Sequence, residues 1–451
     1  MFLILILNLN SKLIINEKAD SNQTLINTFP AFLVWFKMDG SIKFQFLGGV
    51  EEVGRLAMIL EINNLRFLFE YGMSPGRPPR FPLLPPPVDL VLLTHAHLDH
   101  SGMIPWLFSK DDQRIISTEL TGLVSDLLHK DTIKIAKSEG YAIPYSTADV
   151  KAAKNNLSPV EPSQKELIGD DCEIHFHSAG HIPGSLMFEI VGEQKILFTG
   201  DLHVIDTRLV KGTKPVNCDI LFLEGTYAGR DHPKKREELE KDLLDKIDEV
   251  VKRGGIAILP AFAVARSQEL AMILRKSGYN IWFDGMGKKV SNIFLKYPQH
   301  LRSAENLKKA LNKINIVHSD HGRKLALKSE VIITSSGMMD GGPVLSYMRK
   351  LKNDPKSAVI LTGYQIPGTN SRLLVDKGQL DFFGVREKIE CEVQYFDFSA
   401  HAGHSELIKF AEGCNPKKII IMHSENREAL VEPLKEIAEV YTPKTGEVVN
   451  L

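Results

Sequence analysis

The stretch THAHLDHSG, at residues 94–102, decides the fold, because it follows an apolar segment and brings four potential metal ligands together. These ligands are His95, His97, Asp99 and His100. Side chains two positions apart in an extended segment point the same way, so His95 and His97 can share one metal ion. Asp99 and His100 lie further along and are placed to reach a second ion. Imidazole and carboxylate together suit zinc, and also manganese or iron.

Other short apolar segments have the length and composition of strands. Each is rich in β-forming residues and bounded by Gly, Pro, Asn or Asp, and the set comprises 65–69, 88–93, 186–191, 195–199, 219–223 and 418–422. Helical stretches alternate with them, such as the charged segment 233–253, in which Leu and Ile recur at helical spacing. The charge of that segment is typical of a solvated helix face. The sequence therefore predicts an α/β protein.

Five apolar segments lead, within a residue or two, to a side chain suited to metal binding or proton transfer. These side chains are His95, Asp201, Glu224, His401 and His423. Strand ends in an open sheet carry loops that present side chains while the strands stay rigid. We therefore expect the five side chains to converge on one sheet edge and to form a site.

A centre with two metal ions needs further ligands, and the sequence offers them. His181 lies in the glycine-bounded turn AGHIPGS, Asp201 has two oxygens that could bridge both ions, and His423 follows an apolar segment. Three further histidines are interpreted as loop, structural or solvated residues rather than ligands: His175, His177 and His203.

Length and composition exclude several classes of protein. At 451 residues, with 43% hydrophobic and 25% charged residues, the chain has the size and composition of a soluble two-domain protein. Its formal net charge of −1 gives no global attraction to a polyanion, so positive charge for nucleic acid must be local or carried by metal. Four scattered cysteines without a C-x-x-C pair argue against a disulfide framework and indicate a reducing cytoplasm.

The N-terminal segment differs from the rest of the chain. Residues 1–37 begin with the apolar run MFLILILNL, which is too short to span a membrane and has no basic residue ahead of it. Ordinary strand-forming sequence starts at Met38. We therefore expect residues 1–37 to be an extension, with Met38 as the true start, and we expect no association with a membrane.

Several motifs resemble those of one known family. THAHLDHSG, AGHIPGS and FTGDLH resemble the second, third and fourth motifs of the metallo-β-lactamase fold. LEGTYAGRDH, DFSAHAGH and IIIMHSE resemble motifs A, B and C of its β-CASP branch, as do LGGVEEVGR, PAFAVARSQEL, TSSGMMDGG and TGYQIPGT. The likeness covers residues 42–425. More narrowly, it is to the archaeal homologues of the endonuclease subunit of the cleavage and polyadenylation specificity factor.

The resemblance implies an α/β architecture in which an αββα metallo-β-lactamase sandwich is interrupted by an inserted α/β β-CASP domain. The sandwich would comprise residues 38–228 and 391–451, and the β-CASP domain residues 229–390. One departure from the family pattern is visible, because the first motif usually ends its strand with Asp, whereas FLFEYG has Glu70. This leaves the role of Glu70 open but does not affect the metal ligands.

The resemblance also implies two Zn²⁺ ions per chain. The first ion would be bound by His95, His97 and His181, the second by Asp99, His100 and His423, and both by Asp201. His401 would be the catalytic histidine of motif B, with Glu224 as its hydrogen-bonded partner. Asp99 counts with these two among the predicted catalytic residues.

The activity implied by the family is that of a zinc-dependent ribonuclease acting in RNA processing or decay. It would be an endonuclease, with additional 5′→3′ exonuclease activity left open. Two cations about 3.5–4 Å apart can neutralise a phosphodiester and lower the pKa of bound water toward roughly 7. His401, held by Glu224, would protonate the leaving 3′ oxygen, giving a 5′-phosphate and a 3′-hydroxyl.

Single-stranded RNA is the expected partner, and a homodimer is a further expectation from the family. TSSGMMDGG is predicted to join a strand to a helix, where exposed amides could bind phosphate; a plain glycine-rich turn is an equal alternative. Arginines could contact the RNA backbone or pair with surface carboxylates. The predicted RNA contacts are Ser335, Ser336, Gly337, Arg266 and Arg372.

Other functions fit the sequence less well. RNA is favoured over DNA because motif C carries His423, where DNA-repair relatives carry an apolar residue. An RNase J-like 5′→3′ exoribonuclease is one alternative, although DFSAHAGH is nearer to the cleavage-factor type. A non-catalytic RNA-binding scaffold is another, although scaffold relatives lose ligands that this chain keeps. A thioester or lactam hydrolase needs neither the inserted domain nor Glu224 and His401.

Overall fold

The computed structural model describes residues 42–451 except 75, 77, 110–112, 170–171, 364 and 367. The expected extension at residues 1–37 and the expected start at Met38 lie outside the described residues. No helix in the described part of the chain is long and apolar enough to cross a membrane.

The first sheet begins with antiparallel strands and continues with parallel ones. Its order is β22-β1-β2-β3-β4-β5-β6, with β3 to β6 parallel. Its strands are β1 (Lys43–Gly48), β2 (Ala57–Ile62), β3 (Leu65–Phe69), β4 (Leu90–Leu92), β5 (Ile115–Ser117), β6 (Leu157–Pro159) and β22 (Val448–Asn450). The sheet therefore joins the first and last strands of the described chain.

The second sheet has the order β21-β20-β11-β10-β9-β8-β7, with β10, β11, β20 and β21 parallel. Its strands are β7 (Lys165–Ile168), β8 (Cys172–Ser178), β9 (Leu186–Val191), β10 (Lys195–Phe198), β11 (Ile220–Glu224), β20 (Lys418–Met422) and β21 (Glu439–Tyr441). The chain thus leaves this sheet after β11 and returns to it at β20.

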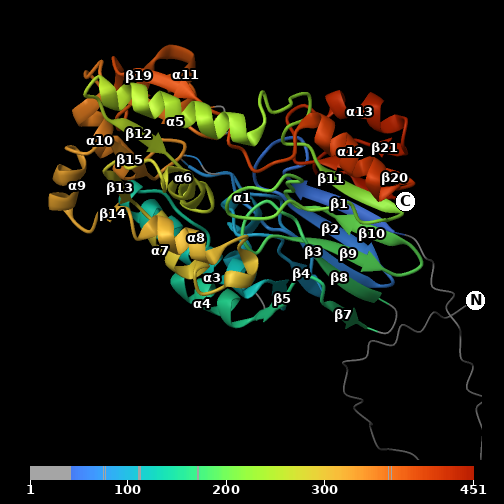
Figure 1. Cartoon of the computed structure of the whole chain (residues 1–451). Coiled ribbons are helices and arrows are strands. Elements are labelled where there is room, and N and C mark those ends of the chain that lie inside the picture. The colour runs from blue at the N-terminus through green and yellow to red at the C-terminus, as the bar shows by residue number, and fades with distance from the viewer. Residues whose placement is uncertain are drawn as a thin grey trace, which may run out of the picture. The chain divides into compact units, whose positions relative to one another are not determined.

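The two sheets pack face to face, with helices on both outer faces (Figure 1). Aromatic residues fill the space between them, and the ring centroids of Phe44 and Phe222 lie 5.1 Å apart in an edge-to-face contact. The helices of the first sheet are α1 (Leu98–Ser101), α2 (Ile104–Leu107), α3 (Glu119–Glu139) and α4 (Thr147–Asn155), and those of the second are α12 (His404–Cys414) and α13 (Glu428–Lys435). The expected αββα sandwich is confirmed.

A third, parallel sheet has the order β14-β13-β15-β12-β16-β19 and lies between two layers of helices. Its strands are β12 (Ala257–Pro260), β13 (Ile281–Asp284), β14 (Asn315–Ile316), β15 (Val331–Thr334), β16 (Ala358–Leu361) and β19 (Glu392–Tyr395). Its helices are α5 (Arg236–Lys252), α6 (Arg266–Leu274), α7 (Gly287–Phe294), α8 (Ala304–Leu311), α9 (Asp320–Ala326), α10 (Pro343–Leu351) and α11 (Asn370–Lys377). A 3₁₀ turn (Pro298–His300) and the hairpin β17 (Gln379–Asp381) and β18 (Arg386–Lys388) complete this part.

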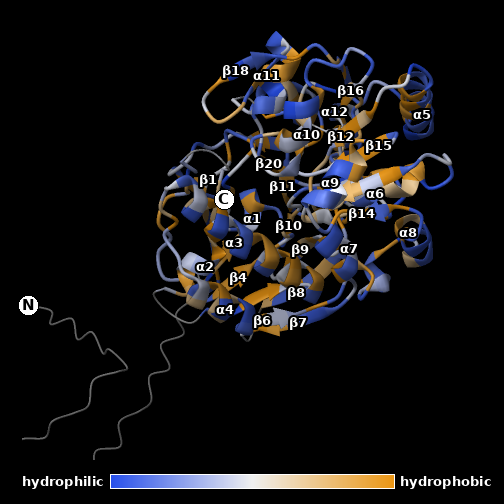
Figure 2. Cartoon of the chain, turned by 90° about the vertical axis from the view of Figure 1, so that its left-hand side faces the viewer, coloured by the Kyte–Doolittle hydropathy of each residue, from blue (hydrophilic) through white to orange (hydrophobic). Residues whose placement is uncertain are grey.

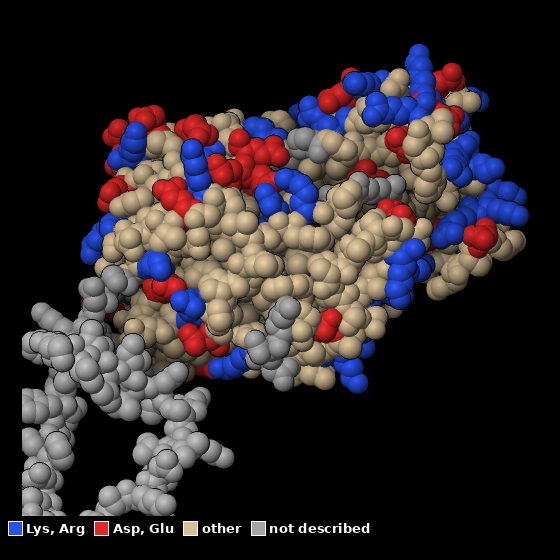
Figure 3. Space-filling model, turned by 180° about the vertical axis from the view of Figure 1, so that it is seen from behind, with Lys and Arg blue, Asp and Glu red and all other residues tan. Residues whose placement is uncertain are grey.

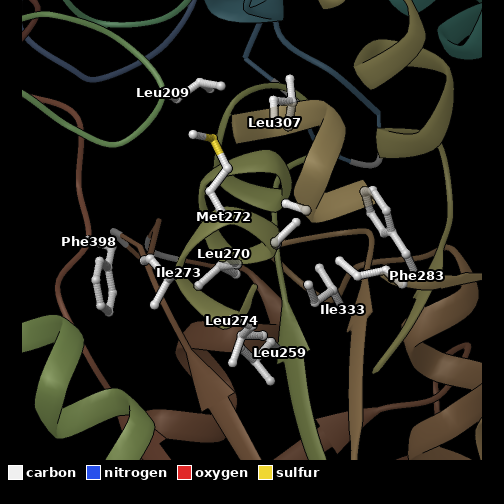
Figure 4. Close-up of a cluster of buried hydrophobic side chains, with 14 of the residues drawn as sticks. Leu209, Leu259, Leu270, Met272, Ile273, Leu274, Phe283, Leu307, Ile333 and Phe398 are labelled. Carbon is white, nitrogen blue, oxygen red and sulfur yellow. The ribbon is translucent and has the colours of Figure 1, made fainter. Parts of the chain in front are cut away.

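The core of the third sheet continues into the sandwich. Leu209, which follows β10, belongs to the same buried cluster as Leu270 of α6, Ile333 of β15 and Phe398, which follows β19 (Figure 4). Figure 2 shows hydrophobic residues concentrated on the strands and on the helix faces turned toward them. This shared core fixes the loops after β10 and β19 relative to α6.

The strand predicted at 418–422 has the bounds of β20, and the charged helix predicted at 233–253 is observed as α5, which begins three residues later and ends one residue earlier. The predicted domain boundaries at 228 and 390 stay a prediction. β19 begins just after the second boundary and pairs with β16 in the third sheet.

Candidate metal centre

The seven predicted ligands lie together where strands end. His95, His97, Asp99 and His100 follow β4 of the first sheet, whereas Asp201 and His423 follow β10 and β20 of the second. His181 lies in the loop between β8 and β9.

The expectation that all the site residues meet at one sheet edge is wrong. The contributing strands belong to three sheets, because β19 pairs in the third sheet, ends at Tyr395, and is followed by His401 six residues later. The site forms where the carboxyl ends of strands from packed sheets face one another, which strand patterns alone do not specify.

The first ligand set consists of His95, His97, His181 and Asp201. The Nδ1 atom of His97 lies 3.1 Å from Nε2 of His95 and 3.1 Å from Nε2 of His181. Oδ2 of Asp201 lies 3.6 Å from each of the same two Nε2 atoms. His97 is half-buried and the other three are buried, so the four ligand atoms surround a small space largely closed to solvent.

The second set consists of Asp99, His100 and His423, and Asp201 lies between the two sets. Nε2 of His423 is 3.7 Å from Oδ2 of Asp99 and 3.8 Å from Oδ1 of Asp201. Nε2 of His100 is 3.4 Å from Oδ2 of Asp201. Asp201 therefore presents an oxygen to each set, as a bridging ligand would.

The chemistry of these residues fits metal ions. Burial holds the pKa of His97 and of His181 down at about 3, so both rings are neutral, the form in which imidazole binds metal. His181 donates its Nδ1 proton to the Ala400 carbonyl at 2.7 Å, which leaves its Nε2 lone pair facing His97. Nitrogens bound to one tetrahedral zinc ion lie roughly 3.3 Å apart, close to the spacing here.

Buried atoms without partners support the same interpretation. Both ring nitrogens of His100 and of His423, together with Oδ1 of Asp201, are buried without a hydrogen-bond partner in the described structure. Burial opposes a charge on His100, but Asp201 and Asp99 outweigh it and hold the pKa of His100 well above its usual range. The carboxylates therefore favour positive charge at this position, which either a proton on His100 or a bound cation could supply.

Glu70, whose role the sequence left open, lies beside the second set. Its Oε1 accepts the backbone N–H of Thr94 at 2.9 Å, and its Oε2 lies 3.5 Å from Nδ1 of His100. A partner on the outer ring nitrogen orients a metal-binding imidazole. Glu70 is placed to do this for His100.

His401 and Glu224 form a hydrogen-bonded pair at the edge of the cluster. Nδ1 of His401 donates to Oε1 of Glu224 at 3.0 Å, and Nε2 lies 3.9 Å from Oδ2 of Asp201. Glu224 is held by the backbone N–H groups of Leu202 and Thr226, each at 3.0 Å. Burial lowers the pKa of His401, but the charges of Glu224 and Asp201 outweigh it and raise the pKa to about 9.

Three residues that support the loop of His401 were not singled out from the sequence: Tyr227, His232 and Asp397. The first two lie in the motif LEGTYAGRDH. Nε2 of His232 donates to the His401 carbonyl at 2.9 Å, and the Tyr227 hydroxyl donates to Asp397 at 2.8 Å. The Tyr227 ring stacks against His401 with centroids 6.1 Å apart and 16° between the planes. These side chains hold the loop that carries His401.

The predicted RNA contacts differ in their surroundings. Arg266 begins α6, and its positive charge lowers the pKa of His97, so it lies near the centre. Arg372 lies in α11 and forms an exposed ion pair with Asp376 at 2.9 Å.

The segment 335–342 links β15 to α10, which begins only at Pro343. Ser335 and Ser336 are half-buried, and Gly337 is buried against the backbone of Ala261 and Phe262. Gly337 therefore does not present an exposed amide at a helix start, because it packs against a neighbouring loop. His203 is also buried, and its ligand atoms lie close to those of His232 and Glu406 and are not grouped with those of the seven ligands.

Comparisons with known proteins agree with this geometry. Family models match at residues 51–251 (metallo-beta-lactamase superfamily), 266–374 (Beta-Casp domain) and 386–443 (Zn-dependent metallo-hydrolase RNA specificity domain). "Probable RNase MJ4" of Methanocaldococcus jannaschii is 37% identical over 90% of this chain and 99% of its own length. "RNase aCSPSF2" of Saccharolobus solfataricus is 32% identical over 90% of this chain and 85% of its own.

A solved protein of unknown function from Enterococcus faecalis V583 covers 91% of this chain and 100% of its own with a TM-score of 0.57. At 14% identity, that likeness shows the fold alone.

The sandwich with its clustered His and Asp side chains defines a metallo-hydrolase fold. The chain belongs to the β-CASP branch of the metallo-β-lactamase superfamily, with archaeal relatives of the cleavage-factor type.

Proposed function

We propose that this protein is a ribonuclease that hydrolyses RNA phosphodiesters with two Zn²⁺ ions, acting mainly as an endonuclease in a cytoplasmic RNA-processing or decay pathway. The observation that carries the proposal is Asp201, which lies between two complete ligand sets and faces the His401–Glu224 pair. The RNA specificity domain matched at 386–443 and the RNase names of the relatives support RNA as the substrate.

The ions would be held by the seven ligands described above, with Asp201 shared. When bound, a pair of cations neutralises the charge of a phosphodiester and lowers the pKa of water toward roughly 7. Glu70, Thr94 and the Ala400 carbonyl orient the imidazoles from outside.

His401 supplies the proton for the leaving oxygen. Its Nδ1–H is fixed on Glu224, so the proton available for transfer is the one on Nε2, which faces Asp201 and the ligand cluster. Glu224 and Asp201 raise the pKa of His401 to about 9, which favours the protonated ring that a general acid needs. Asp99, with 24% of its side chain exposed, is the ligand carboxylate most open to substrate and water.

Arg266 is the best-placed of the predicted RNA contacts. Its Nε atom is buried without a hydrogen-bond partner among the described residues, and burial together with Arg236 lowers its pKa to about 10, so it stays charged. A guanidinium whose buried Nε–H has no partner is suited to bind a phosphate. Ser335, Ser336, Gly337 and Arg372 stay predictions for the same role.

Cleavage of a 5′-labelled single-stranded RNA by the wild type and by His401→Ala tests the proposal. We expect a loss of at least about 10²-fold in the variant, and wild-type products with 5′-phosphate and 3′-hydroxyl ends. His318→Ala, at an exposed histidine, is the matched control. Equal rates for His401→Ala and the wild type would remove His401 from the mechanism, and faster cutting of DNA than of RNA would remove RNA as the substrate.

An RNase J-like 5′→3′ exonuclease is the second candidate. A relative named "RNase J-like protein" from Methanocaldococcus jannaschii is 32% identical over 86% of this chain and 94% of its own. Circular RNA separates the two activities, because only an endonuclease cuts it. A third candidate, a non-catalytic scaffold, predicts fewer than about one tightly bound metal ion per chain, whereas a two-metal enzyme holds two.

A further inference from the structure

A second group of histidine and carboxylate side chains lies on the second sheet. His175 and His177 on β8 and Glu189 on β9 have ligand atoms within 4.8 Å of one another. The alternating residues of these strands, such as Phe176 and Phe188, face the core between the two sheets. The three side chains therefore lie on the opposite, outer face of the sheet.

The strand register brings the group together. His175 lies directly opposite Glu189 in the antiparallel ladder, and His177 is two positions further along β8 on the same face. Oε2 of Glu189 accepts from Nε2 of His177 at 2.8 Å and lies 3.3 Å from Nδ1 of His175. One carboxylate oxygen thus faces two imidazole nitrogens.

A hydrogen bond on the far side of the His175 ring leaves its other nitrogen, Nδ1, facing Glu189. Nε2 of His175 hydrogen-bonds to Glu173, which also faces Lys165 at 3.2 Å. A neutral ring that gives its one N–H to Glu173 has a lone pair on Nδ1, and that lone pair faces Glu189. Lys195 lies 3.7 Å from the other oxygen of Glu189, Oε1. Two acceptors 3.3 Å apart require either a second proton or a cation between them.

The pattern of contacts matches that of a metal-binding histidine. Such a histidine usually donates its outer N–H to a carboxylate, which fixes the tautomer and directs the other nitrogen to the ion. Glu173 occupies that outer position for His175. The side chain of Glu189 is 5% exposed, whereas those of His175 and His177 are 30% and 29% exposed, so an ion can enter from solvent.

We propose that His175, His177 and Glu189 bind one divalent transition-metal ion of the zinc type, separate from the candidate metal centre. Two imidazoles and one carboxylate suit Zn²⁺, whereas Mg²⁺ and Ca²⁺ prefer oxygen ligands alone. Three protein ligands leave a coordination position for water. The ion joins β8 to β9, and the loop between these strands carries His181, so its binding stabilises the hairpin that supports the candidate centre.

Metal analysis of the full chain tests the proposal. The wild type and His175→Gln/His177→Gln are dialysed against the same low-micromolar Zn²⁺, and bound zinc is measured by mass spectrometry. We expect the double variant to bind about one zinc ion fewer per chain, and Zn²⁺ to raise its unfolding temperature less than that of the wild type. His318→Gln/His321→Gln, at two exposed histidines outside the candidate ligand groups of the described chain, should bind as the wild type does.

RNA cleavage separates this test from that of the proposed function. We expect the double variant to cut RNA within about 2-fold of the wild-type rate, because its substitutions lie outside the reacting residues. Glu189→Gln keeps both histidines and the shape of the site, and it should also bind about one zinc ion fewer per chain. It replaces the double variant in this test if the double variant does not fold. Equal zinc content in the wild type and in a folded variant would show that a proton, and no metal ion, joins these side chains.

Discussion

Three residues next to the candidate centre have positive φ angles, which non-glycine residues rarely adopt. Glu70 has φ +57°, His423 has φ +53°, and Ala265, directly before Arg266, has φ +66°. Each such conformation costs about 1–3 kcal/mol and persists where the surroundings demand it. At Glu70 and His423 the turn comes just after a strand and directs the side chain toward His100. Side-chain placement at the site thus outweighs local backbone preference.

The two predicted arginine contacts should differ in their effect on RNA binding. Arg266→Met removes a half-buried charge near His97, and we expect it to raise KM for RNA at least about 10-fold and to reduce the salt dependence of binding by about one charge. Arg372→Met removes an exposed charge paired with Asp376 and should change KM less than about 2-fold. Steady-state kinetics at several salt concentrations measures both effects. A larger effect at Arg372 would place the RNA path over α11.

Two loop segments, 225–232 and 396–403, act together as the support of His401. They are joined by His232, Asp397 and Tyr227, and His232 Nδ1 lies 3.5 Å from Oδ2 of Asp397. A packed and hydrogen-bonded support keeps a proton donor within the narrow range of productive positions. The loop that carries His401 is therefore positioned by contacts from the loop after β11.

His232→Ala tests this support. Loss of the bond to the His401 carbonyl should lower kcat about 10-fold with little change in KM, because His401 acts in the chemical step and not in substrate binding. His232→Gln, whose amide can still donate, should recover part of the rate. Single-turnover cleavage and zinc content are measured together, since a role limited to folding would reduce both. If KM rose while kcat stayed constant, His232 would be a substrate contact.

At the scale of the whole molecule, charge is distributed unevenly. Seen from behind, Lys and Arg are crowded toward the end that carries the third sheet, whereas the middle of that face is mostly uncharged (Figure 3). The net charge of −1 conceals this local concentration. The arrangement agrees with the expectation that attraction to a polyanion, where it exists, is local.

The sequence predicts several strands and one long helix of this molecule but not how they pack together. The strand at 65–69 and the ligand stretch 94–102 follow from periodicity and composition, which are local properties. The approach of Glu189 to His175 and His177 depends on the register between β8 and β9, and the burial of Gly337 depends on packing against the loop after β12. Such contacts are set by tertiary structure, so both histidines were interpreted as structural or solvated side chains.

Removal of metal should weaken the whole fold, because the seven ligands connect the first sheet to the second. His95 to His100 follow β4, and Asp201 and His423 follow β10 and β20, so ions shared by these residues cross-link the sandwich. A ligand that binds only the folded state at about 1,000 times its Kd stabilises it by roughly 4 kcal/mol. We therefore expect chelation to lower the unfolding temperature by at least about 5 °C and added Zn²⁺ to restore it.

Calorimetry of the native, chelated and reloaded protein measures this change. His95→Ala/His97→Ala, which removes two ligands of the first set, is the comparison variant, and its unfolding temperature should fall by less on chelation. The surface group at His175 contributes separately, so His175→Gln/His177→Gln should keep most of the response. An unfolding temperature that chelation leaves unchanged would mean that the seven side chains are preorganised without metal, and that the charges of the buried Asp201 and the half-buried Asp99 are balanced by protonated His100 and His401 alone.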